Sequence, residues 1–246
     1  MTQEKLSTRI INLVYYGIFK EQCYVCSVKD EDNLCNTCQT FLTPNISNCG
    51  KCARPMPTSV ALCGQCQIHP PSYRRIIAPL SYSGLARGLI TRAKFSQKGH
   101  LFRPLTRCLA TSLLEQLDQT KHWHWCVIPS GKASLIERGF CQTRFIRTQL
   151  KQMMRSQLTH PFSQFDISRT KERPAQHTLS KKDRHRITAS AFNIPLPAPK
   201  YVVLIDDIIT TGSTVDACAK ALRQAGTQEV LVVALARTPP QTGEPN

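Results

Sequence analysis

The chain has 246 residues, 41% of them hydrophobic, with 11 Gly and 16 Pro. This composition suits one sizeable core with a smaller appendage and argues against a disordered chain. The formal net charge is +16, and residues 71–246 hold a net +15 of it, against +1 for residues 1–70. Polyanionic partners such as phosphates or nucleic acid are therefore favoured.

The apolar run nearest the N-terminus is Ile10–Phe19 (IINLVYYGIF), and a small-residue cleavage site does not follow it. It is too short to span a bilayer, which takes about 20 residues. We expect this run to form a short helix packed on the rest of the protein. The sequence thus predicts a cytoplasmic protein without membrane insertion.

Twelve cysteines are many for this length, and eight of them form four C-x-x-C pairs in the first 70 residues. The pairs are Cys23/Cys26, Cys35/Cys38, Cys49/Cys52 and Cys63/Cys66. Four thiolates complete a tetrahedral zinc site, so this pairing favours metal ligation over disulfides. We expect at least one structural zinc ion, and the spacing leaves open which pairs share an ion. A redox-active C-x-x-C is the less favoured alternative, because no pair follows a clear βα pattern.

The cysteine region ends in Ile68–Pro71 (IHPP), which cannot continue a helix and is typical of a hinge between domains. We therefore expect an N-terminal helix and zinc-binding cysteine domain over residues 1–70 and a second domain over 71–238. The remaining residues, 239–246, contain prolines without apolar periodicity, and we expect them to be a disordered tail.

Apolar strands alternate with amphipathic helices along the second domain. The expected strands cover residues 75–82, 125–129, 201–206 and 230–236. The expected helices cover residues 85–95, 104 to about 117, 142 to about 154, and 214–225. This alternation predicts an α/β fold with a parallel sheet that is covered by helices on both faces.

The most informative segment begins at the end of the strand expected over residues 201–206. Asp206 and Asp207 come at its carboxyl end, where open parallel sheets bind ligands. Two adjacent acids there would repel each other unless they accept hydrogen bonds from hydroxyls or face a cation, and a ribose and a magnesium ion would meet those needs. The next segment, Thr210–Thr214 (TTGST), places a glycine and several hydroxyls at a helix start, so that N–H and O–H donors converge on one anion. A nucleotide triphosphatase loop is not indicated, because that loop needs a lysine and a second glycine.

The whole string over residues 202–214 (VVLIDDIITTGST) resembles the signature of the type I phosphoribosyltransferases, which bind phosphoribosyl pyrophosphate (PRPP). By this resemblance, Asp206 and Asp207 take the ribose hydroxyls. The residues implied to bind the 5-phosphate are Thr210, Thr211, Gly212, Ser213 and Thr214.

Two further segments carry basic groups toward the same place. Ser130–Gln142 (SGKASLIERGFCQ) contains Lys132, Arg138 and Gly139, which suit a loop that approaches a diphosphate closely. Residues 168–186 carry a net charge of +5 in 19 residues. A solvated basic surface is the alternative interpretation of this second segment.

Nearly the full chain resembles the ComF family, which comprises phosphoribosyltransferase-like proteins associated with natural competence. The resemblance rests on the paired cysteines, the PRPP motif and several short segments. These segments are Lys94-Phe95, Val127-Ile128-Pro129, Arg138-Gly139-Phe140 with Gln142, and Arg169-Thr170 with Gln176, Leu179 and Arg184. Cys141 and Ile187 stand where the family usually has Asn. The resemblance implies a type I phosphoribosyltransferase-like sheet preceded by a small zinc-binding domain with four C-x-x-C pairs.

On this basis we assign Arg138, Arg169 and Arg184 to catalysis. The resemblance places Arg138 in a pyrophosphate loop and residues 169–186 in a mobile lid. Lys132 and Gly139 are expected to join the acid pair and the phosphate turn in binding PRPP together with magnesium.

The expected activity is transfer of a phosphoribosyl group from PRPP to an unknown acceptor, with release of pyrophosphate, in natural competence and DNA uptake. The alternative is a non-catalytic component of the competence machinery that senses PRPP or binds single-stranded DNA. It explains the +15 of residues 71–246 better than a small substrate does. The expected partners are PRPP, single-stranded DNA and other competence proteins.

Overall fold

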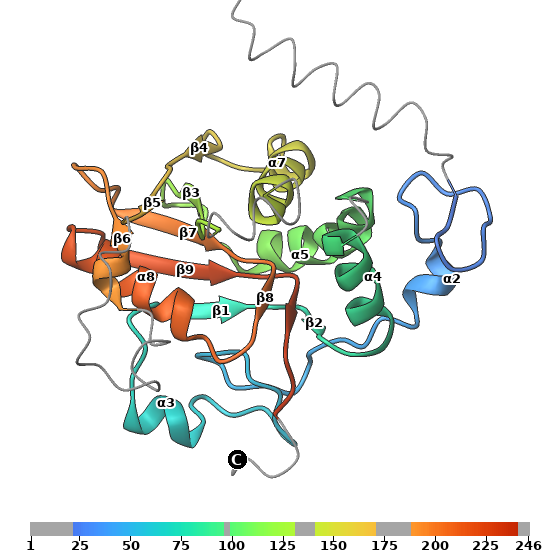
Figure 1. The fold of residues 1–246 in the computed structure, drawn as a ribbon, viewed down its shortest axis with the longest axis horizontal. Helices are drawn as coiled ribbons and strands as arrows, with labels where there is room; N and C mark the ends of the chain where they lie inside the picture. The colour runs from blue at the N-terminus through green and yellow to red at the C-terminus, as the bar shows by residue number, and fades with distance from the viewer. Residues whose placement is uncertain (1–21, 96–98, 131–140, 171–187, 241–246) are drawn as a thin grey trace, which may run out of the picture. The chain divides into compact units, whose positions relative to one another are not determined.

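The computed structural model describes residues 22–95, 99–130, 141–170 and 188–240 (Figure 1). The chain divides into two compact units, residues 1–41 and residues 42–246. This division differs from the boundary expected near residue 70, because the third and fourth cysteine pairs pack in the same core as the sheet of the second unit. The apolar run Ile10–Phe19 and most of the expected tail lie outside the described residues.

The described part of the first unit is a cysteine-rich turn structure with one short helix, α2 (Asn36–Gln39). Its backbone is closed by hydrogen bonds from Cys23 N to Val28 O at 2.7 Å and from Tyr24 N to Asn33 O at 2.8 Å. Leu34 and Cys38 are buried within it. The described part of this unit therefore buries few apolar side chains, and its cysteines are the obvious means of holding it together.

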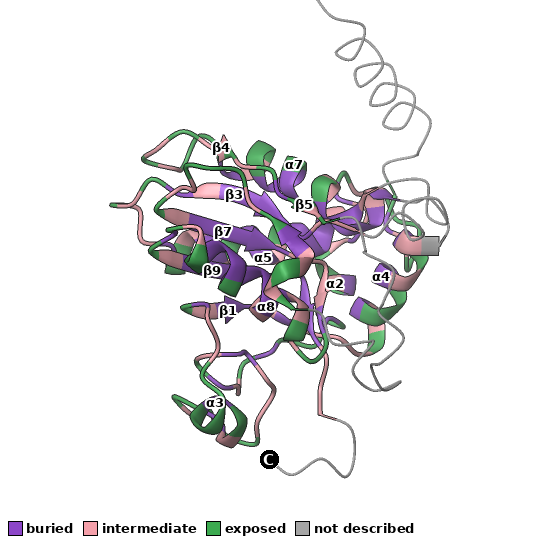
Figure 2. Ribbon diagram, turned by 60° about the vertical axis from the view of Figure 1, so that its left-hand side comes forward, coloured by how far each residue is buried: buried purple, intermediate pink, exposed green. Residues whose placement is uncertain are grey.

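The second unit is built on a five-stranded sheet with the order β1-β9-β7-β3-β4, in which every neighbouring pair is parallel. The strands are β1 (Arg75–Ile77), β3 (His124–Val127), β4 (Ser163–Gln164), β7 (Tyr201–Ile205) and β9 (Glu229–Val233). Val202–Ile205 and Val230–Val233 are buried throughout, as a sheet covered on both faces requires (Figure 2). The predicted parallel α/β sheet is confirmed.

Three of these strands continue into a second parallel sheet with the order β2-β10-β8. Its strands are β2 (Leu80–Ser81), β8 (Ile208–Ile209) and β10 (Ala236–Arg237). The single strands expected over residues 75–82 and 230–236 are therefore wrong in detail, since each is interrupted. Pro79 explains the first interruption, because proline has no N–H to extend the ladder.

Helices cover both faces of the sheet. They are α4 (Gly84–Phe95), α5 (Phe102–Gln116), α7 (Gln142–Met154) and α8 (Ser213–Gln224), with the short α3 (Gly64–Ile68) in the second cysteine region. The four long helices agree with the expected ranges to within one or two residues. Two short 3-10 helices, Gly99–Leu101 and Ala189–Ala191, and an antiparallel pair of β5 (Ser168–Arg169) with β6 (Phe192–Asn193) complete the described part.

The side-chain alternation of the strands separates the two faces. Val202 and Leu204 of β7 share one apolar cluster with Val215 and Leu222 of α8, while α5 contacts β1 and α7 contacts β3 and β7. Ile209 of β8 belongs to the α8 cluster as well, although an uninterrupted strand would turn it to the other face. One residue is thus effectively inserted between β7 and β8, where the acid pair lies.

No helix among the described residues is both long enough and apolar enough to cross a bilayer.

Candidate functional site

The phosphate turn, residues 210–214, connects β8 to α8. Gly212 has φ of +87° and serves as the N-cap of α8, a left-handed conformation that a side chain would strain. The Thr211 and Ser213 hydroxyl oxygens lie 2.9 Å apart, and the Ser213 N–H donates to Thr211 Oγ1 at 3.3 Å. Thr210, Thr211 and Ser213 are exposed to solvent. Hydroxyls and N–H groups at the start of a twelve-residue helix make a site for an anion.

The acid pair, Asp206 and Asp207, fills the gap between β7 and β8. Asp206 accepts a hydrogen bond from Asp207 N at 2.9 Å, and Asp207 accepts one from Ile208 N at 2.7 Å. Lys94 of α4 forms an ion pair with Asp207 at 2.7 Å, and both side chains are about 15% exposed. Burial and then the neighbouring Asp207 charge raise the pKa of Asp206 to about 8, although Lys94 opposes the shift. The two carboxyl groups therefore lie so close that the negative charge of one disfavours ionisation of the other.

Lys94 was not among the expected site residues. It was part of the Lys94-Phe95 segment that carries the family resemblance, but its position opposite Asp207 depends on how α4 packs over the sheet. Neither the helical spacing of α4 nor the strand pattern of β7 contains that information.

Arg169 is the described member of the three expected catalytic arginines. It lies in β5, and its Nε donates to Pro129 O at 3.0 Å, just beyond the carboxyl end of β3. Its guanidinium lies over the Phe192 ring, 5.8 Å from the centroid. Cys218 on α8 lies within electrostatic range of both Arg169 and the acid pair. Burial raises the pKa of its thiol, the charge of Asp206 raises this pKa further, and the charge of Arg169 lowers it. The structure thus brings Arg169 to the sheet edge that carries the acid pair.

The remaining expected ligands of the diphosphate, Lys132, Arg138, Gly139 and Arg184, lie outside the described residues, so their roles stay predictions. The ends of the segment 131–140 are described. Ser130 Oγ lies 3.8 Å from Cys141 Sγ, and Thr143 Oγ1 donates to Ile128 O at 3.2 Å. The segment therefore leaves and rejoins the fold at the carboxyl end of β3, the neighbour of β7.

The eight paired cysteines form two clusters. The first contains Cys23, Cys26, Cys35 and Cys38, the second contains Cys49, Cys52, Cys63 and Cys66, and the sulfur atoms of each lie within 4.8 Å of one another. The structure therefore answers what the spacing left open: the first pair joins the second, and the third joins the fourth. Four thiolate donors at such distances suit a tetrahedral metal site.

The environment lowers the pKa of one thiol in each cluster, whereas burial and the neighbouring cysteines raise the pKa of Cys26, Cys38, Cys52 and Cys66. Burial alone would raise the pKa of Cys49, but the backbone N–H groups of Cys52 and Cys63 lower it to about 7. The Cys63 N–H, for example, points at Cys49 Sγ at 3.2 Å. In the first cluster, backbone N–H donors likewise overcome burial and lower the pKa of Cys23 to about 6. Such N–H···S contacts are what a metal-bound thiolate accepts.

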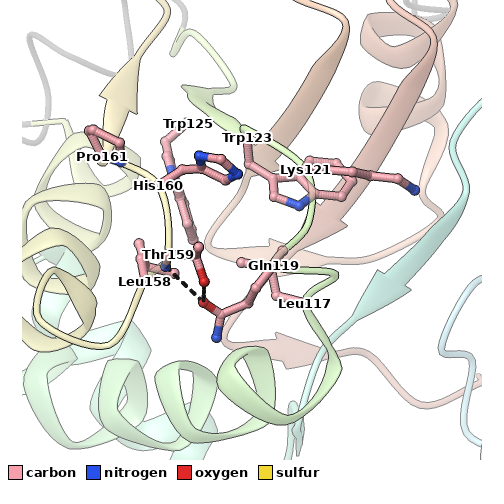
Figure 3. Close-up of a pocket in the computed structure, with 9 residues that line it drawn as sticks. All are labelled: Leu117, Gln119, Lys121, Trp123, Trp125, Leu158, Thr159, His160 and Pro161. Atoms are coloured by element: carbon pink, nitrogen blue, oxygen red, sulfur yellow. Dashed lines mark hydrogen bonds between the residues drawn. The ribbon is translucent and has the colours of Figure 1, made fainter.

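A small hollow lies at the other end of the sheet (Figure 3). Its volume is about 10 Å³, room for one water molecule at most. It lies beside Trp123 and Trp125, at the amino end of β3, and Gln119 closes it by accepting hydrogen bonds from Thr159 N at 3.0 Å and Thr159 Oγ1 at 3.2 Å. Ligands of parallel sheets bind at the carboxyl ends of strands, so this hollow is not the functional site.

The parallel sheet, the acid pair and the phosphate turn together define a phosphoribosyltransferase-like protein. Residues 149–246 match the family model described as the phosphoribosyl transferase domain. The "DNA utilization protein YhgH" of Escherichia coli K12 is 28% identical over 222 residues, which cover 83% of this chain and 90% of that protein. "Competence protein F" of Haemophilus influenzae is 29% identical over 214 residues, which cover 84% and 91%. These matches agree with the resemblance of the motifs to the ComF family of phosphoribosyltransferase-like proteins.

Among solved structures, a hypoxanthine-guanine phosphoribosyltransferase from Bacillus anthracis aligns with 58% of this chain and 75% of its own, at 12% identity and a TM-score of 0.39.

Proposed function

We propose that the acid pair and the phosphate turn bind PRPP and that the protein works in the uptake or use of DNA during natural competence. The observation that carries the proposal is the order of groups along one stretch of chain: two adjacent half-buried acids, then a left-handed glycine, then the start of a long helix. The acids suit vicinal hydroxyls, and the helix start suits a phosphate. The names of the relatives support the link to competence and DNA.

In the proposed reaction, the bond between the anomeric carbon of PRPP and its diphosphate oxygen breaks, and an acceptor nitrogen forms the new bond. Diphosphate leaves with the bonding electron pair, and the acceptor loses a proton. Magnesium, when bound with PRPP, supplies positive charge to the leaving diphosphate, and the carboxylates of Asp206 and Asp207 are donors of the type that it prefers.

The chain's own part in this reaction is electrostatic and positional. The phosphate turn fixes the 5-phosphate, the acid pair orients the ribose, and Arg169 adds a cation at the end of β3. We assign Lys132, Arg138, Gly139 and Arg184 to the diphosphate side of the site. No protein nucleophile is needed, because the diphosphate is already a good leaving group.

Asp207→Asn tests the binding proposal. The exchange is nearly isosteric and removes one charge from a hydroxyl contact, which corresponds to about 1.5–3 kcal/mol, or a tenfold to hundredfold weaker Kd for PRPP with magnesium. Asp118→Asn is the matched control, because that carboxylate also accepts a backbone N–H, from Thr120 at 3.1 Å, and pairs with a lysine, Lys121 at 3.1 Å, but lies outside the acid pair and the phosphate turn. Calorimetric titration gives both affinities. Equal binding by Asp207→Asn and wild type would remove the acid pair from the site.

Turnover needs a separate measurement. Release of pyrophosphate from PRPP, screened against purine and pyrimidine bases, distinguishes an enzyme from a PRPP sensor. We expect release with at least one base in wild type and its loss in Arg169→Met. Tight PRPP binding without release from any base would leave the sensing role.

A second candidate function, binding of single-stranded DNA, is favoured by the charge of the helices on one face of the sheet. Helices α4, α5 and α7 hold eight Lys or Arg residues against one acid, Glu115, whereas α8 on the other face holds two against one. Five of the eight are exposed: Arg87, Arg92, Arg107, Arg144 and Lys151. A cationic helix layer of this kind attracts a phosphate backbone without reading its sequence.

The salt dependence of DNA affinity tests this candidate. Each phosphate contact contributes about −0.7 to the slope of log K against log salt on single strands. Arg144→Glu with Lys151→Glu should therefore flatten the slope by about 1.4. Lys220→Glu, at an exposed site on α8, should leave the slope unchanged. DNA affinity that is undetectable at low salt would exclude this function.

A further inference from the structure

Arg237 lies between the phosphate turn and the second cysteine cluster. It belongs to β10, and its side chain is almost fully buried, at 3% exposure. Its Nη1 donates to Ile209 O at 3.0 Å and also to Thr210 O, and its Nε donates to Cys52 O at 3.1 Å. One guanidinium thus joins two carbonyls at the start of the phosphate turn to one carbonyl of the cysteine cluster.

The bonds to the turn fix the direction of its N–H groups. In a planar trans peptide, the C=O of one residue and the N–H of the next point in opposite directions. Because Arg237 holds the Thr210 carbonyl, it also directs the Thr211 N–H away from itself. The Ile209 carbonyl is held twice, by Arg237 and by Thr238 N at 2.9 Å, so the amide plane before Thr210 is fixed as well. Donors that must meet an anion are thereby set before the anion arrives.

The other side of Arg237 depends on the second cluster. A buried guanidinium that donates to neutral carbonyls needs negative charge nearby. Four thiolates around one divalent cation carry a net charge of −2, so a filled second cluster supplies the needed counter-charge. Its cysteines also share an apolar cluster with Ile209 and Val215, at the two ends of the phosphate turn.

We propose that Arg237 is a positioning residue of the phosphate turn and that the second cysteine cluster, through its contact with Arg237, is a structural part of the phosphate site. The expected effect on PRPP affinity rests on the proposed PRPP site, whereas the expected effect on the backbone of the turn does not. It assigns the second cluster a role in ligand binding. The first cluster belongs to the other compact unit.

Arg237→Lys is the central test, since lysine keeps the charge but cannot reach three carbonyls in one plane. We expect the amide hydrogens of Asp216 and Thr238, which donate to Gly212 O and Ile209 O, to exchange at least tenfold faster than in wild type without ligand. We also expect the Kd for PRPP with magnesium to rise at least tenfold. Arg223→Lys is the matched control, because Arg223 also donates to two successive backbone carbonyls, Thr227 O and Gln228 O, beyond the other end of α8. That variant should change neither quantity.

A second pair of variants tests the cluster. Cys66→Ser should lower the metal content and speed exchange of the Asp216 and Thr238 amides, whereas Cys26→Ser should lower the metal content alone. If Arg237→Lys fails to fold, exchange in wild type before and after removal of metal with a chelator gives the same comparison.

Unchanged exchange in folded Arg237→Lys, or in metal-depleted protein, would overturn the proposal. If wild type binds no PRPP at all, the proposed function fails, but the exchange data still decide the role of Arg237.

Discussion

The acid pair predicts an unusual dependence of stability on pH. The pKa of Asp206 rises from its ordinary value of 3.8 to about 8 on folding, so the folded chain binds this proton more tightly than the unfolded chain. The contribution to stability is therefore fully present below the unfolded pKa, and it is lost as the pH rises through about 8. Asp206→Asn removes this loss, because asparagine is neutral at every pH. Its Oδ1 can still accept the hydrogen bond from Asp207 N, which is 2.9 Å long in wild type.

The size of the effect follows from the shift. Each pH unit between the two pKa values is worth up to about 1.4 kcal/mol, so from pH 6.5 to 8.0 wild type should lose up to about 2 kcal/mol relative to Asp206→Asn. Asp206 is only half-buried, so solvent screening reduces the expected loss to about 1 kcal/mol. For a chain of this size that is about 2–4 °C in Tm.

Thermal melting of ligand-free wild type and Asp206→Asn from pH 6 to pH 9 measures the difference. We expect the two Tm curves to separate as the pH rises, with the variant more stable, while the variant binds PRPP more weakly. Asp118→Asn should show the same pH dependence as wild type. Parallel curves for wild type and Asp206→Asn across this range would refute the reasoning about the acid pair.

Three further outcomes are expected. Gly212→Ala should cost about 1–2 kcal/mol in stability through its left-handed backbone alone, since its new Cβ would meet atoms no nearer than 3.8 Å. Gly88→Ala, in open space on α4, should instead stabilise the protein by about 1 kcal/mol, and denaturant melts compare the two variants. Protein purified without added zinc should contain two equivalents of zinc and Cys63→Ser one; a folded, reduced and metal-free wild type would disprove the zinc assignment. Lys94→Met should raise the pKa of Asp206 further and move the separation of the Tm curves to higher pH, and an unmoved midpoint would show that Lys94 does not shield the pair.

The part of the site that is contiguous in sequence was predictable, because its signal is local. A buried strand, two acids, a glycine and a helix start fall within residues 201–214, and each has its own propensity. Lys94 and Arg237 were not identified as site residues, since their roles depend on the packing of α4 and β10 against that segment. Their sequence neighbours show only a helix and a strand.

The fold was predictable to a similar extent. The long helices have clear apolar spacing, so their ranges were correct to within one or two residues. Strands β4, β5, β6 and β8 have two residues each, too few for any alternation to show. The expected hinge at Ile68–Pro71 was a sound inference from its prolines, but the structure's division at Phe41 and Leu42 depends on the core that the cysteines of residues 49–66 share with the sheet.

The inserted residue between β7 and β8 has a consequence for register. Leu204 and Ile209 face the same side only because the alternation of side chains shifts by one position at the acid pair. Both residues of β8 are isoleucines, so their identity does not determine which one faces inward. The number of residues from Ile205 to Gly212 determines it. Deletion of Ile208 would leave the composition of the turn nearly unchanged, yet it would break the register of β8 against β10 and shift Gly212 by one position relative to β7. The length of this segment is therefore under stricter constraint than most of its side chains.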